Sequence, residues 1–173
     1  EPLVKRLLAI ATKSNGHDHP LAAIIQANLA TIYWKTGRAD ASEATFRSAI
    51  AKLETQPGMF RAMSARAQAD LGSFYVDQRR FAEAEPLLKQ ALTIAEEVSG
   101  PSHWSVANAL GSLAVFYDVQ EKYSVAKPLH ERARAITRAS AFSAEDLTVA
   151  AKTNNLAQHY FLQQKWKEAV GLY

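Results

Sequence analysis

The stretch LGSFYVDQRRFAEAEPLLKQALTI, residues 71–94, decides the fold because the chain repeats it in recognisable form. Residues 113–136 read LAVFYDVQEKYSVAKPLHERARAI, and residues 29–52 read LATIYWKTGRADASEATFRSAIAK. The three copies start 42 residues apart. A fixed period of this length is typical of proteins that stack one small structural unit on the next.

Each copy is predicted to be two antiparallel helices. Apolar side chains recur at helical spacing on both sides of residues 78–80, where the phase breaks and a turn is expected. The leading leucine and the tyrosine four residues later recur in a fourth copy after 43 residues, at Leu156 and Tyr160. The extra residue lies between Ile136 and Val149, where a loop tolerates an insertion. Glycines with the same period are expected to end helices in the left-handed conformation, at Gly16, Gly58 and Gly100.

Small residues recur where paired helices must approach closely. The first helix of each copy is expected to use Ala30, Gly72, Ala114 and Ala157, and the second to use Ser42, Ala84, Ala126 and Ala169. An aromatic residue three positions before the second set, at Phe81, Tyr123 and Trp166, is predicted to wedge between helices; the first copy has Ala39 there.

The order Leu-small-x-x-Tyr, aromatic-x-x-Ala and a further Ala seven residues on resembles the tetratricopeptide repeat. The period of 42, the loops at 15–23 and 99–107, and the pair Glu85-Pro86 resemble the kinesin-light-chain variety of that repeat. The resemblance covers the whole chain; the first copy departs from it by lacking the wedge aromatic and carrying Ser42, and the loop after Ile136 lacks the Gly-x-x-His pattern. It implies an all-α, right-handed superhelical solenoid, with the first helix of each pair lining the concave side.

The repeat register also predicts the organisation of the chain as a single array over residues 1–173. The expected units are a partial repeat at 1–20, full repeats at 21–60, 61–104 and 105–146, and a partial repeat at 147–173. Both ends fall within a second helix and lack polar caps. We therefore expect a piece of a longer array, or ends that favour association with a neighbour.

Composition excludes several classes of protein. With 48% hydrophobic residues the chain is not disordered, and its longest apolar runs of five residues are far short of the roughly 20 that span a membrane. There is no cysteine, hence no disulfide framework or thiolate metal site. A net charge of +3 does not by itself call for nucleic acid or an anionic membrane.

The stripe of each first helix opposite the packing residues is predicted to face a groove. A row of short polar groups, one per repeat, can pair with the backbone of an extended peptide, at Asn28, Asp70, Ser112 and Asn155. Apolar patches for its side chains are expected at Trp34, Val76 and Phe161. The candidate site residues are Asn28, Thr31, Trp34, Arg66, Asp70, Ser73, Asn108, Ser112, Asn155, Gln158 and Phe161. An ordinary solvated helix face remains the alternative interpretation of this stripe.

Other functions find little support in the sequence. The stripe is not basic, since Asp70, Asp77 and Asp118 oppose Lys35 and Arg66, so nucleic-acid binding is not expected. The lysine positions that chaperone-binding members of the family use to clamp a terminal carboxylate correspond to Ala27, Ala69 and Ala151.

The cluster His17, Asp18 and His19 is a weak metal motif, and His103, two periods after His19, favours a role in loop packing. No phosphate loop or hydrolase motif occurs. We expect no enzyme activity, no cofactor and no metal.

We therefore expect a scaffold that binds a peptide or a segment of a partner protein in the groove. The alternatives are an assembly module that self-associates through its uncapped ends, or a module that serves a fused effector domain. A cytoplasmic location is the expectation, with periplasmic and secreted placements left open.

Overall fold

The computed structural model describes residues 1–15, 19–140 and 147–172. Its helices are α1 (Pro2–Asn15), α2 (Pro20–Lys35), α3 (Ala39–Glu54), α4 (Met59–Asp77), α5 (Phe81–Ser99), α6 (Trp104–Val119), α7 (Tyr123–Ser140), α8 (Leu147–Leu162) and α9 (Trp166–Val170). None of the described residues lies in a β-strand. The predicted all-α solenoid is confirmed.

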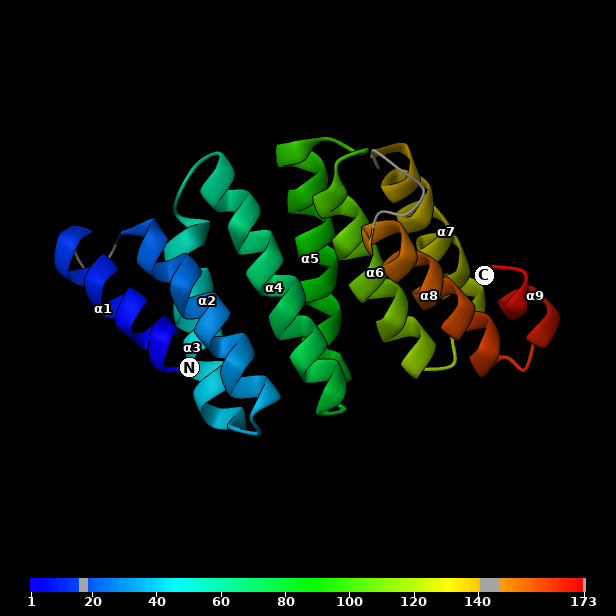
Figure 1. Cartoon of the computed structure of the whole chain (residues 1–173), viewed down its shortest axis with the longest axis horizontal. Coiled ribbons are helices and arrows are strands. Elements are labelled where there is room, and N and C mark those ends of the chain that lie inside the picture. The colour runs from blue at the N-terminus through cyan, green and yellow to red at the C-terminus, as the bar shows by residue number, and fades with distance from the viewer. Residues whose placement is uncertain (16–18, 141–146, 173) are drawn as a thin grey trace.

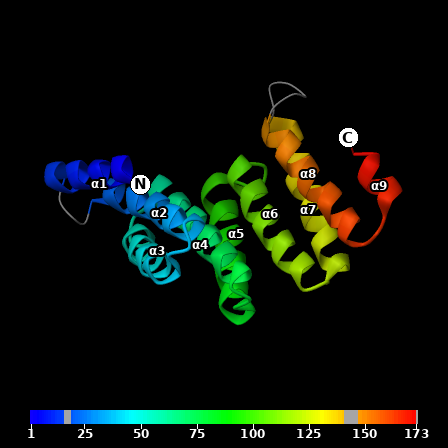
Figure 2. The same cartoon turned by 60° about the horizontal axis from the view of Figure 1, so that its bottom comes forward.

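The helices form consecutive antiparallel pairs along one long axis (Figures 1 and 2). In these pairs α2 packs on α3, α4 on α5, α6 on α7 and α8 on α9. We call the first member of each pair the A helix (α2, α4, α6, α8) and the second the B helix (α3, α5, α7, α9), with α1 a B helix by sequence register.

Contacts between pairs explain which side of the stack is concave. Each A helix contacts the next A helix, from α2 to α4, α4 to α6 and α6 to α8, whereas successive B helices of the described chain do not contact one another. Elements on the inside of a curved stack are closer together than those on the outside. The A helices therefore line the inner surface, as the resemblance implied.

The turn inside each pair has the same hydrogen-bond pattern in all four copies. The residue with positive φ is Gly37 (76°), Arg79 (60°), Glu121 (59°) or Gln164 (59°), at spacings of 42, 42 and 43. The next residue donates its backbone N–H to the carbonyl of the repeat tyrosine, over 2.9–3.0 Å at Tyr33, Tyr75, Tyr117 and Tyr160. This bond and the positive φ define the Schellman motif, which satisfies carbonyls at the helix end.

The periodic glycines were predicted to end helices in the left-handed conformation, and this was wrong in detail. Gly58 (φ 64°, ψ −130°) directly precedes α4, and Gly100 (φ 84°, ψ 157°) follows α5. Both have the positive φ that favours glycine, but their ψ values are extended, because the chain must leave one repeat and enter the next. Gly16 lies outside the described residues.

Small residues confirm the predicted close approaches. Ala30, Ala114 and Ala157 of the A helices, and Ser42, Ala84, Ala126 and Ala169 of the B helices, are all buried. At Gly72 a Cβ would lie 2.7 Å from Cγ of Leu88, so only glycine fits. Ser42 departs from alanine without cost because its hydroxyl donates to the carbonyl of Ala30 over 2.9 Å.

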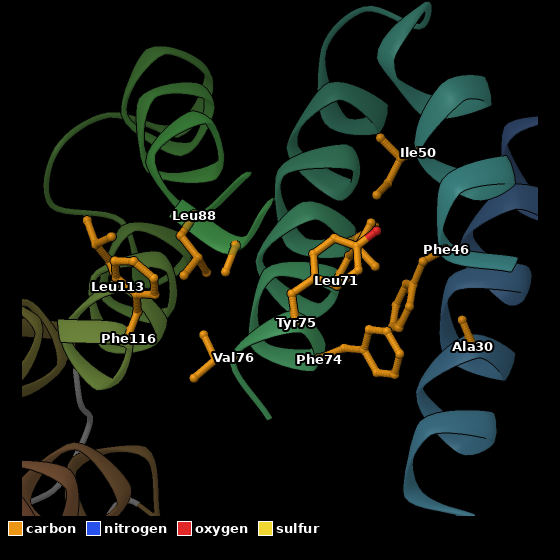
Figure 3. Close-up of a cluster of buried hydrophobic side chains, with 12 residues drawn as sticks. Ala30, Phe46, Ile50, Leu71, Phe74, Tyr75, Val76, Leu88, Leu113 and Phe116 are labelled. Atoms are coloured by element: carbon orange, nitrogen blue, oxygen red, sulfur yellow. The ribbon is translucent and has the colours of Figure 1, made fainter. Parts of the chain in front are cut away.

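The core runs continuously from one pair to the next. Phe46 on α3 and Phe74 on α4 meet in one part of it, and Val76, Leu88 and Phe116 meet where α4, α5 and α6 join (Figure 3). The predicted wedge Phe81 packs against the same cluster and contacts Phe116 edge to face, at 6.1 Å between ring centroids.

A ladder of polar contacts between consecutive repeats recurs with the same period. Arg80 bonds Glu43, and Tyr75 donates its hydroxyl to Oε1 of Glu43 over 2.9 Å. One copy later Tyr117 donates to Glu85 over 3.3 Å. Each ladder ties a B helix to the A helix and turn of the following repeat.

Candidate functional site

A cavity of about 490 Å³ opens on the inner surface between α4, α6 and α8. Its walls come from these three A helices, and Ala91 and Ala95 of α5 lie beneath it. Both alanines are buried, so their small side chains leave space where the A helices diverge. The cavity is thus built into the join between two full repeats and the next A helix.

Lys152 of α8 is the most unusual side chain of the cavity. It is half-buried, and desolvation lowers the pKa of its ammonium group. No carboxylate among the described residues pairs with it. The ammonium Nζ lies 3.2 Å from the place that a Cβ of Gly111 would occupy, so the missing side chain of Gly111 makes room for the lysine.

Arg66 and Asp70 lie one turn apart on α4 and bring opposite charges to the same cavity. Burial raises the pKa of Asp70, and the neighbouring charges of Arg66 and Lys35 oppose that rise. Arg66 is exposed and Asp70 is half-buried. Among the described residues, the cavity therefore has two cationic groups, Arg66 and Lys152, against one carboxylate of weakened acidity.

The row of short polar groups predicted from the sequence lies along this inner surface. Asp70, Ser112 and Asn155 line the large cavity, and Asn28 lines a shallow hollow beside Arg66 and Asp70. Ser73 and Asn108 also line the large cavity. Six of the predicted site residues thus meet in one place: Arg66, Asp70, Ser73, Asn108, Ser112 and Asn155.

Four predicted residues lie outside both hollows: Thr31, Trp34, Gln158 and Phe161. The Trp34 indole donates from Nε1 to Oδ2 of Asp77 over 3.0 Å and meets Phe74 edge to face. Phe161 is 56% exposed and its ring lies 4.8 Å from that of Trp166. Gln158 is exposed, and the Thr31 hydroxyl donates to the carbonyl of Ala27 on its own helix.

Two residues assigned to the groove stripe are buried instead. Val76, predicted as an apolar patch for a ligand, is 5% exposed and belongs to the core. Asp118 is 6% exposed and bonds two histidines. The prediction placed both residues on the groove side from helical spacing alone, whereas they lie where one helix pair packs against the next.

The sequence interpretation missed Lys152 and Trp104. Lys152 occupies the position of Ala67 and Ala109, which are buried in the preceding A helices. A lysine where earlier copies have buried alanine was a detectable signal. Trp104 lies at the cavity edge, 48% exposed, with its ring 5.4 Å from that of His103.

The histidines of the loops act as helix caps. His19 and His103 precede α2 and α6, and each accepts a hydrogen bond from the backbone N–H two residues later. This agrees with the predicted packing role for these residues. His17 and Asp18, the other members of the weak metal motif, lie outside the described residues.

Comparison with known proteins agrees with this architecture. The family model for the tetratricopeptide repeat matches residues 1–55 and 63–139, which is most of the chain. The chain belongs to the tetratricopeptide repeat family. Proteins with these repeats generally mediate contacts between proteins, and the scaffold is typically non-enzymatic.

Several solved structures share the fold across 99% of this chain. BtubC (BKLC) from P. vanneervenii is 22% identical with a TM-score of 0.77, and 68% of its chain is covered. Two further structures come from Podosopora anserina and are named for a kinesin light chain with nearly identical TPR-like repeats. Both are 23% identical to this chain. One has a TM-score of 0.71 with 80% of its chain covered, and the other has a TM-score of 0.68 with 81% covered. The predicted likeness to kinesin light chain is confirmed at the level of the fold.

No curated protein matches the chain. Among its described helices, none has both the length and the apolar character to cross a bilayer.

Proposed function

We propose that this tetratricopeptide repeat array binds an extended segment of another protein on its inner surface, and that the cavity between α4, α6 and α8 holds an acidic group of that segment. Lys152 carries the proposal. No carboxylate of the described chain pairs with this half-buried ammonium, which is therefore costly to keep charged. A bound carboxylate would stabilise it, so the free energy of the ion pair would appear mainly on binding.

The rest of the cavity suits a peptide backbone. Asn108 and Asn155 each offer an amide that can donate and accept, and Ser112 adds a hydroxyl. Buried backbone groups of a ligand need such partners, because an unmade hydrogen bond costs about 1–3 kcal/mol. Arg66 at the edge can pair with a second acidic group, since it is exposed.

The scaffold lowers the entropic cost of binding. The polar residues lie on A helices held by the continuous core, so few of them must be ordered when a ligand binds. Trp104, exposed beside the cavity, provides an apolar surface for a neighbouring side chain of the segment.

A charge-matched pair of variants tests the proposal. Peptides are selected from a random displayed library on the whole chain, and their affinity is measured by isothermal titration calorimetry. We expect acidic peptides whose affinity falls at least about tenfold with Lys152→Glu, which corresponds to the loss of one charge-assisted bond. Lys127→Glu makes the same charge change on the exposed side of α7 and should leave affinity unchanged. Equal losses in both variants, or selection of peptides without acidic groups, would contradict the proposal.

Self-association is the second candidate, and an apolar stripe on α1 favours it. Leu3, Leu7 and Ile10 share one face of this helix and are 76%, 54% and 54% exposed. Such a face suits another helix pair, whether from a second copy or from further sequence. Light scattering that shows a mass independent of concentration, with Leu7→Glu behaving as the wild type, would exclude the second copy.

A further inference from the structure

Three buried polar side chains meet where the last two helix pairs join. Asp118 comes from α6, His130 from α7 and His159 from α8, and they are 6%, 2% and 0% exposed. His130 Nε2 lies 2.7 Å from Oδ2 of Asp118, and His159 Nδ1 lies 2.6 Å from Oδ1. The three ligand atoms that they offer all lie within 4.8 Å of one another. We call these residues the polar trio.

The polar trio replaces an apolar trio found one repeat earlier. Val76, Leu88 and Phe116 stand 42, 42 and 43 residues before Asp118, His130 and His159, and all three are buried in the core. The positions one repeat earlier again hold Trp34, Phe46 and Phe74, which pack against the same core. The fold therefore does not require polar groups at this place. Three positions far apart in the sequence have changed chemistry together, which favours a shared role.

The surrounding hydrogen bonds define the state of His159. Lys165 donates to Oε1 of Gln163 over 2.7 Å, which directs the amide nitrogen of Gln163 toward His159. That nitrogen lies 2.8 Å from His159 Nε2 and donates to it, so Nε2 accepts and the ring proton is on Nδ1, facing Asp118.

The charge of Asp118 has no strong counterion. Its carboxylate makes ion contacts with the two histidines and with no lysine or arginine among the described residues. A buried carboxylate is stable only with a compensating positive charge or with many hydrogen bonds. An anionic oxygen and two imidazole nitrogens on three different helices are also a ligand set for a borderline metal ion.

We propose that the polar trio binds one divalent transition-metal ion of the zinc class, through a carboxylate oxygen of Asp118, Nε2 of His130 and Nδ1 of His159. Zinc ligands lie about 2.0–2.2 Å from the ion, so neighbouring ligand atoms of a tetrahedral site stand about 3.3–3.5 Å apart. Each nitrogen must therefore move about 0.6–0.9 Å away from the Asp118 oxygen that it now contacts at 2.6–2.7 Å. Both histidines bind through an unprotonated ring nitrogen, which for His159 means that its proton moves from Nδ1 to Nε2.

Gln163 can serve the metal-bound form as well. With the proton of His159 on Nε2, a rotation of the Gln163 amide presents Oε1 as the acceptor. Three protein ligands leave one position for water. No catalytic role follows, since the site is enclosed by the helix pairs.

The bound ion would hold α8 to α6 and α7. His159 is one turn after Asn155 and two turns after Lys152 on α8, so the ion would also stabilise the helix that carries part of the cavity. The metal site itself does not depend on what the cavity binds.

The test uses the untagged whole chain, stripped with a chelator and titrated with zinc chloride by calorimetry. We expect one ion per chain, bound more tightly than about 10 μM, and a higher melting temperature with zinc. Asp118→Val/His130→Leu/His159→Phe copies the apolar trio and should lose both effects. Asp118→Asn keeps the shape and should weaken binding at least tenfold, which covers the case that the triple variant folds poorly. His103→Ala removes an exposed histidine and should bind zinc as the wild type does.

Absence of saturable binding at one ion per chain would overturn the proposal and leave the polar trio as a hydrogen-bonded network only. Equal binding by the wild type and by Asp118→Asn would overturn it too, because the ion would then be elsewhere.

Discussion

Val76, Leu88 and Phe116 fill the join between the second and third repeats, and Asp118, His130 and His159 fill the next join at equivalent positions. Figure 3 shows the apolar trio between α4, α5 and α6. Both joins hold the same helix arrangement, one by apolar burial and the other by charge-assisted hydrogen bonds. The backbone geometry of a repeat thus tolerates very different cores, provided that every polar group has a partner.

The largest effect is expected when one histidine enters the apolar join. Phe116 is surrounded by buried apolar side chains, so a histidine at this position would lose apolar burial and leave a ring N–H unpaired. Phe116→His should therefore lower the free energy of unfolding by about 3–5 kcal/mol. Chemical denaturation measures this. The complete transfer, Val76→Asp/Leu88→His/Phe116→His, should cost less than the sum of its three single changes, because the new groups pair with one another. Strict additivity would show that the two joins are not equivalent.

Apolar replacements in the polar trio should lower the free energy of unfolding by less. The loss depends on how many of the three residues are replaced. Asp118→Val alone leaves two buried imidazole rings without their carboxylate partner and should cost about 2–5 kcal/mol. In the presence of a chelator, the triple change to Val, Leu and Phe should be neutral or stabilising, as for other buried charge clusters. A triple variant less stable than Asp118→Val would contradict this.

Close packing of the A and B helices gives the next effect. Gly72→Ala places a Cβ 2.7 Å from Cγ of Leu88 and should destabilise by about 1–3 kcal/mol. The matched control Ala114→Gly, at the equivalent position of the next repeat, should cost about 0.5–1 kcal/mol through helix propensity. A stabilising effect of Gly72→Ala would contradict this, because it would show that Leu88 can adopt another rotamer that avoids the added methyl group.

The smallest effect on stability is expected from the polar contacts that Glu43 makes with Tyr75 and Arg80 of the next repeat. A hydrogen bond from Arg80, aided by the Tyr75 hydroxyl, lowers the pKa of Glu43 to about 2, against the opposing effect of desolvation. Because the folded pKa is lowered, the stabilisation is present above the ordinary pKa near 4.5 and is lost as the pH falls toward 2. At neutral pH it should be roughly 1–2 kcal/mol, since the group is partly solvated. Denaturation midpoints of Glu43→Gln and the wild type should differ at pH 7 and converge near pH 2.

The same comparison shows how much the sequence predicts. Period, helix pairing, the turns after Tyr33, Tyr75, Tyr117 and Tyr160, and the small packing residues follow from local spacing, and the structure agrees with them. The polar trio was not predicted, because its members are 12 and 29 residues apart and no local motif joins them. Aligning the copies would have revealed it, since each member replaces an apolar residue of the preceding repeat.

The repeat period also made part of the candidate site predictable. Asp70, Ser112 and Asn155 are one repeat apart, so their common surface follows from the period. The cavity itself does not, because it depends on the buried alanines of α5 and on Gly111, whose missing side chain admits Lys152. Val76 was misplaced because helical spacing alone does not tell which residues of an A helix the following pair covers.

If the inner surface formed by the A helices binds the partner, a ligand should protect these helices from hydrogen–deuterium exchange. We would measure exchange of the whole chain with and without a library-selected acidic peptide. We expect added protection in α4, α6 and α8 around Arg66, Ser112 and Asn155, with the B helices α3 and α7 unchanged. Protection confined to α1 or to the B helices would contradict it.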